Sequence, residues 1–238
     1  MSRGMLLVLL CSIATVMGCA EDAPVDVPAP VPYAIDAMVD GKTYTEWAIG
    51  WHQFMMAVPI AEVPFLDTTG AHCADRQTGP VWYLAGAGSS DPVTRACTIP
   101  ANTKIFLPLV NYLNDFPCPD PTFAPAAGQS LEAFLTAGAS GIAVATTDVG
   151  LDVDGVAIPN VRNYRVTTNM FNFTADISNQ ANDSCITGME QQGVSDGYWL
   201  MLPPLSPGAH TLHIHALQDW GGGATFAQDV TYNLTISG

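Results

Sequence analysis

Three histidines near the C-terminal end, His210, His213 and His215, have the side chains best suited to bind a transition metal. If this segment is a strand, His213 and His215 project from one face, because side chains two residues apart in a strand share a face. Their Cα atoms would lie ~6.6 Å apart, so both imidazoles could reach one ion. A zinc, copper or iron site needs a further ligand, for which His72 or Asp219 is available. The alternative is an exposed strand face with two titratable histidines and no metal.

Calcium is a second possible cofactor, because Asp148, Asp152 and Asp154 lie close together and calcium prefers oxygen ligands on loops. The segment lacks the spaced acidic ligands and the distal glutamate of an EF-hand. A two-residue hairpin turn already explains Asp154 and Gly155.

Trp220 is the aromatic residue most suited to bind a ligand, because it follows Asp219 and precedes three glycines in a predicted turn. A flat aromatic ring that is exposed on a turn can stack on the apolar face of a sugar. Trp82 and Trp199 lie within strand patterns, so we expect them in the core. We assign no catalytic residue.

The composition excludes nucleic acid as a partner. The chain has 22 acidic and 7 basic residues, a formal charge of −15, and no cluster of Lys or Arg that could neutralise phosphates. An acidic, lysine-poor surface is also typical of soluble proteins, and it would be repelled by an anionic membrane.

The six cysteines divide into two groups. Cys11 and Cys19 lie in or next to an apolar leader, and the other four are an even number that fits two disulfides in an oxidising compartment. Among the three possible pairings we favour Cys73 with Cys97 and Cys118 with Cys185. The chain has no CxxC spacing that would indicate a metal site instead.

The N-terminal segment predicts export. Residues 1–18 combine Arg3 with a short apolar run, which is typical of a cleaved signal peptide, and the small residue Gly18 directly before Cys19 fits a bacterial lipoprotein cleavage site. Cys19 would then be lipidated and would anchor the protein to a membrane. Residues 19–33 form a proline-rich tether, and the absence of Asp at position 20 favours the outer membrane. Residues 34–238 are expected to be a single β-rich domain.

The remaining pattern predicts a mainly β fold. Thr43 and Glu46 have the spacing of a capping box, and the apolar residues that follow to Pro59 indicate an amphipathic helix. A short helical insertion is expected after Ser130, and residues 178–196 are expected to be a polar loop. The predicted strands are 81–85, 95–99, 104–110, 151–158, 163–168, 170–173, 198–202, 210–217 and 230–236. Many short strands with helices only as covers indicate a β-sandwich or jelly roll.

Several phrases resemble those of a group of uncharacterised bacterial secreted proteins and lipoproteins. They are Gly-Pro-Val-Trp-Tyr-Leu-Ala-Gly at 79–86 and Ser-Asp-Gly-Tyr-Trp-Leu-Met-Leu-Pro-Pro-Leu-Ser-Pro-Gly at 195–208, and the likeness spans roughly residues 43–236. The resemblance implies one secreted β-rich module, and it brings no activity or catalytic residue with it.

Together these observations favour a lipid-anchored protein of the cell envelope that binds a small ligand, a glycan or another envelope component without catalysis. The alternative is a metal-dependent jelly-roll enzyme that uses the histidines around 210–215.

Overall fold

The computed structural model describes residues 28–238, so the predicted signal peptide, Cys19 and most of the predicted tether lie outside the described residues. The described chain is mainly β and contains two five-stranded sheets with few helices. The helices are α1 (Tyr44–Met56), α2 (Leu131–Ala139) and α3 (Gly141–Ala145), with 3-10 turns η1 (Val161–Tyr164) and η2 (Ile177–Ala181). Among the described residues, no helix has the length and apolar character needed to cross a membrane.

The first sheet is built around two long antiparallel strands, β3 and β8. Its strand order is β1-β3-β8-β6, and β7 also pairs with β8. The strands are β1 (Val81–Tyr83), β3 (Lys104–Phe116), β6 (Arg165–Thr167), β7 (Phe171–Thr174) and β8 (Glu190–Leu202).

The second sheet has the order β2-β10-β9-β4-β5. Its alternation matches the sequence pattern, because Val230, Tyr232, Leu234 and Ile236 are all buried. The turn between β4 and β5 is also as predicted, with positive φ at Asp154 and Gly155. The strands are β2 (Val93–Pro100), β4 (Thr146–Val153), β5 (Val156–Ala157), β9 (Gly208–Asp219) and β10 (Thr225–Ser237).

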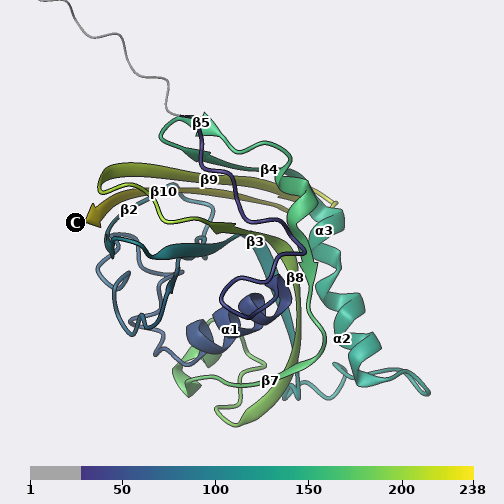
Figure 1. The fold of residues 1–238 in the computed structure, drawn as a ribbon. Helices are drawn as coiled ribbons and strands as arrows, with labels where there is room; N and C mark the ends of the chain where they lie inside the picture. Colours follow the sequence, from purple (N-terminus) through teal and green to yellow (C-terminus); the bar gives the residue numbers. More distant parts are fainter. Residues whose placement is uncertain (1–27) are drawn as a thin grey trace, which may run out of the picture.

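Three layers result, with the first sheet in the middle (Figure 1). Leu107 on β3 and Leu200 on β8 pack toward the second sheet, whereas their neighbours Phe106 and Trp199 pack against α1. Because β3 and β8 are buried on both faces, their sequences are continuously apolar near the centre of the sheet rather than alternating.

The helices begin where the sequence predicts. The side chains of Thr43 and Glu46 form the reciprocal capping box of α1, and Ser130 caps α2. The insertion is longer than expected, because α3 follows α2 directly.

Two expected segments differ from the structure. Residues 178–196 are not a loop throughout, because β8 begins at Glu190 and its residues Ser195 and Asp196 are fully buried. Asp196 can be buried because Arg165 binds its carboxylate through two hydrogen bonds of 2.9 and 2.6 Å. Residues 163–164, expected to be extended, belong to η1.

Both predicted disulfides are confirmed: Cys73 pairs with Cys97, and Cys118 pairs with Cys185. They close loops with sequence separations of 24 and 67, and the chain-entropy model gives a stabilisation of about 3.5 kcal/mol for the first bond and about 4.4 kcal/mol for the second. Such bonds are typical of proteins exported to an oxidising compartment.

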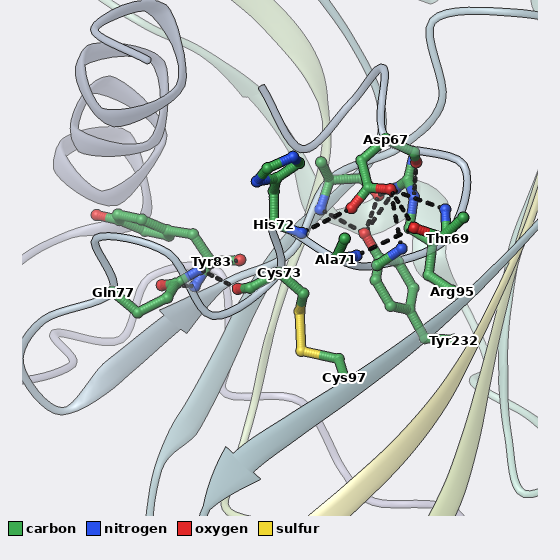
Figure 2. The surroundings of a disulfide bond; sticks show 12 residues. Asp67, Thr69, Ala71, His72, Cys73, Gln77, Tyr83, Arg95, Cys97 and Tyr232 are labelled. Carbon is green, nitrogen blue, oxygen red and sulfur yellow. Dashed lines mark hydrogen bonds between the residues drawn. A yellow bond between two sulfur atoms is a disulfide. The ribbon is translucent and has the colours of Figure 1, made fainter. Parts of the chain in front are cut away.

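The first disulfide lies beside a buried arginine (Figure 2). Arg95 is only 1% exposed, and its guanidinium donates to the carbonyl oxygens of Asp67, Ala85 and Gly86 and to the hydroxyl of Tyr232. Three backbone N–H groups and the hydroxyl of Thr69 donate to the side chain of Asp67. This network joins the irregular segment after α1 to β2 and β10, so it fixes one wall of the cleft described next.

Candidate functional site

A cleft of about 410 Å³ opens where the two sheets meet α1 and α3. This volume lies within the range of small-molecule sites, roughly 300 to 1,000 Å³. Strand β3 contributes one wall with residues 110–113, and α1 contributes Trp51, His52 and Met56. The other lining residues are Phe65, Gly86, Ala87, Gly88, Ile142, Asn182, Asp183, Gln218, Trp220, Phe226 and Gln228.

Two exposed aromatic rings stand at this cleft. Trp220 is 47% exposed and Tyr112 is 46% exposed, and their ring centroids lie 6.4 Å apart. A tight turn holds Trp220, because its N–H donates to the carbonyl of Ala224 and the Asp219 carboxylate accepts from the N–H of Gly221. Asp219 itself does not line the cleft, so its role in the structure is to hold the turn.

Two glutamines form the polar floor of the cleft. Gln218 and Gln228 are 4% and 6% exposed and take positions on β9 and β10 that continue the core-facing alternation. The amide of Gln228 donates to the carbonyl of Leu109 and accepts from the N–H of Ala87. The side-chain amide of Gln218 has no hydrogen-bond partner among the described residues. Its amide atoms are not among the fully buried polar atoms that lack a partner, so they are accessible from the cleft and can bind a ligand.

His52 is a buried residue rather than the boundary residue that its position in the helix indicates. It is 2% exposed, and its Nε2 lies 2.7 Å from the hydroxyl oxygen of Ser195. Burial lowers the pKa of His52 to about 3, so the ring is neutral and weakly basic. The pair joins α1 to β8, and Ser195 is fully buried, so it is not placed as a nucleophile.

Although we assign no catalytic residue, the sequence contains one motif that is typical of catalytic sites. Residues 193–197 read Gly-Val-Ser-Asp-Gly and therefore match Gly-x-Ser-x-Gly, the nucleophile motif of many hydrolases. That motif works on a sharp turn between a strand and a helix, whereas here it lies inside the long strand β8. The residues match the motif, but their position inside a strand does not fit it.

An acidic pair borders the cleft beside Tyr112. Asp183 lines the cleft, and the neighbouring Asp115 is 3% exposed and accepts a hydrogen bond from Gln191 at 2.9 Å. Burial, and then the neighbouring Asp183 carboxyl, raise the pKa of Asp115 to about 7. Near neutral pH the carboxyl of Asp115 is therefore partly protonated.

The structure places His213 and His215 side by side, as predicted, with ring centroids 5.6 Å apart. Each ring faces carboxylates on a neighbouring strand. His213 lies 2.9 Å from Asp229 and 3.5 Å from Asp152, and His215 lies 3.4 Å from Asp148. These contacts follow from the pairing of β9 with β10 and β4.

The other predicted metal ligands have separate partners. His210 lies 2.6 Å from Asp154, and His72 lies 2.8 Å from Asp75 in the segment between α1 and β1. Within residues 28–238, no group of three or more His, Cys, Asp or Glu residues has a geometry that could hold a metal ion. The histidine and calcium hypotheses therefore gain no support from the arrangement of these side chains.

No protein-family model, no curated protein and no solved structure matches this chain.

Proposed function

We propose that this chain is an exported, lipid-anchored β-sandwich protein that binds a glycan in the cleft between its sheets. The observation that carries the proposal is that one cleft is lined by two exposed aromatic rings and by the amide of Gln218, which has no hydrogen-bond partner among the described residues. Trp220 offers a flat apolar face for a sugar ring, and Gln218 offers a donor and an acceptor for its hydroxyl groups.

Tryptophan fluorescence tests the site directly. Four of the five tryptophans are 0–9% exposed, so the emission that responds to an aqueous quencher comes mainly from Trp220. We expect envelope oligosaccharides to protect this emission in the detergent-solubilised, mature protein. Trp220→Ala should weaken binding by at least tenfold, because stacking on a large aromatic ring is lost.

The matched control is Met189→Ala, which removes a side chain that is 71% exposed and does not line the cleft. It should leave affinity unchanged. If no oligosaccharide binds in a glycan array or in a pull-down from envelope fractions, or if Trp220→Ala binds normally, the proposal is wrong.

The lipid anchor and the outer-membrane location are tested separately. Cys19→Ser should shift the protein from the outer-membrane fraction to the soluble fraction, because the acylated thiol is lost. Mass spectrometry that found an unprocessed, unmodified N-terminus in native material would contradict lipid anchoring.

A further inference from the structure

Asp183 of the acidic pair lines the same cleft as the aromatic pair, Tyr112 and Trp220. Tyr112 and Asp115 lie on β3, while Asp183 belongs to the segment after η2. The Cys118–Cys185 disulfide ties these two parts of the chain together, because Cys118 lies three residues after Asp115 and Cys185 lies two residues after Asp183. The disulfide therefore ties Asp183 to the end of β3, the strand that carries Tyr112, rather than leaving it on a free loop.

In the described part of the chain, the cleft is lined by an acidic residue and by no basic residue with a permanent charge. The described residues that line the cleft include no Lys or Arg, and His52 is neutral. Asp183 thus faces the cleft without a cationic partner among them. A carboxylate next to exposed Tyr and Trp rings is the combination that binds organic ammonium groups, through an ion pair and cation–π attraction.

We infer that the glycan bound in this cleft carries a free amino group, whose ammonium lies between Asp183 and the Tyr112–Trp220 pair. This inference rests on the proposed function, since it specifies the sugar that the same cleft binds. Gln218 would bind a hydroxyl of the sugar, and the acidic chain, with a formal charge of −15, favours the approach of a cation.

The test compares a glucosamine tetrasaccharide with its fully N-acetylated counterpart at pH 6, where the free amines are protonated. Both have the same rings for stacking, and only the first carries ammonium groups. We expect the glucosamine tetrasaccharide to bind at least tenfold more tightly in calorimetry. Asp183→Asn should reduce this preference to less than threefold, because the amide keeps the oxygen that accepts from the N–H of Cys185 but carries no charge.

Two control variants separate charge from fold. Asp115→Asn should keep the preference, since Asp115 does not line the cleft and the substitution leaves the carboxyl of Asp183 in place. Asp36→Asn removes an exposed charge outside the cleft and should also keep it. Equal binding of both tetrasaccharides, or a preference that survives Asp183→Asn in a protein with an unchanged unfolding midpoint, would overturn the inference while glycan binding stands. If neither tetrasaccharide nor any other glycan binds, the proposed function fails as well.

Discussion

His52 shows how burial sets the chemistry of a single residue. Its ring lies between Trp51, Trp199 and Phe171, with centroid distances of 5.0 to 6.0 Å, and its Nε2 faces the hydroxyl of Ser195. Desolvation penalises the protonated form, which lowers the pKa of His52 to about 3. The contact between His52 and Ser195 is therefore a structural hydrogen bond, and His52 does not act as a base near neutral pH.

This burial predicts a specific loss of stability in acid. The pKa of His52 is lower in the folded chain than its unfolded value of about 6.5, so the unfolded chain binds the proton first as the pH falls. The free energy of unfolding should therefore decrease by about 3 kcal/mol from this residue between pH 7 and pH 4. Urea unfolding of His52→Gln should show a correspondingly flatter pH dependence than the unsubstituted protein.

His72 provides the control, because it is solvent-accessible and its hydrogen bond with Asp75 raises its pKa. Its folded pKa lies above the unfolded value, so it favours the folded state on the acid side and His72→Gln should not flatten the acid loss. An identical pH profile for His52→Gln and the unsubstituted protein would show that His52 is protonated inside the fold.

At the level of elements, β8 is the strand on which the first sheet depends, and its glycines allow it to approach β3. A Cβ at Gly197 would lie 2.7 Å from the Cα of Asn111 and also too close to the carbonyl of Val110. The close contact between β8 and β3 therefore explains why the last residue of the Gly-x-Ser-x-Gly segment, Gly197, is a glycine.

Gly197→Ala should destabilise the protein by about 3 kcal/mol, because the backbone of β3 cannot move away without breaking its pairing with β8. Gly155→Ala is the comparison, since Gly155 has a φ of +77° but open space around it, and only a backbone cost of about 1 kcal/mol is expected. Chemical denaturation measures both. Equal losses for the two variants would contradict the packing explanation.

The sequence predicts elements whose pattern is local. The capping box of α1, the alternation of β10 and the shared face of His213 and His215 each depend on residues a few positions apart, and the structure confirms all three. The start of β8 does not follow such a pattern, because Ser195 and Asp196 are polar residues whose burial requires partners on α1 and β6.

Of the residues that line the cleft, the sequence analysis singles out only Trp220 as a candidate for ligand binding. Gln218 carried a usable signal, because it continues the alternation of Leu212, Ile214 and Ala216 and so places an amide where an apolar residue is expected. Nothing in the sequence indicates that Tyr112 and Asp183 line one cleft, since they are 71 positions apart and are brought together by tertiary structure and by a disulfide.

At the scale of the whole molecule, the layers converge on the cleft. The second sheet supplies Gln218 and Gln228, the middle sheet supplies Tyr112, and α1 supplies Trp51 and His52. Sites at the junction of packed elements are common because the surrounding core holds their side chains in place. A ligand in this position contacts every layer and should stabilise the folded chain.

The net charge of −15 gives the last prediction, because a charge of this size acts over the whole surface and not only at Asp183. Attraction of a cationic glycan should be screened by salt, since the Debye length falls from about 10 Å at 0.1 M to about 3 Å at 1 M. We expect the association rate of the glucosamine tetrasaccharide, measured by stopped-flow fluorescence, to fall several-fold between 0.05 and 0.5 M NaCl. The N-acetylated tetrasaccharide carries no charge and should change by less than twofold. Parallel salt dependence of the two ligands would mean that the acidic surface does not contribute to recognition and that its role is solubility alone.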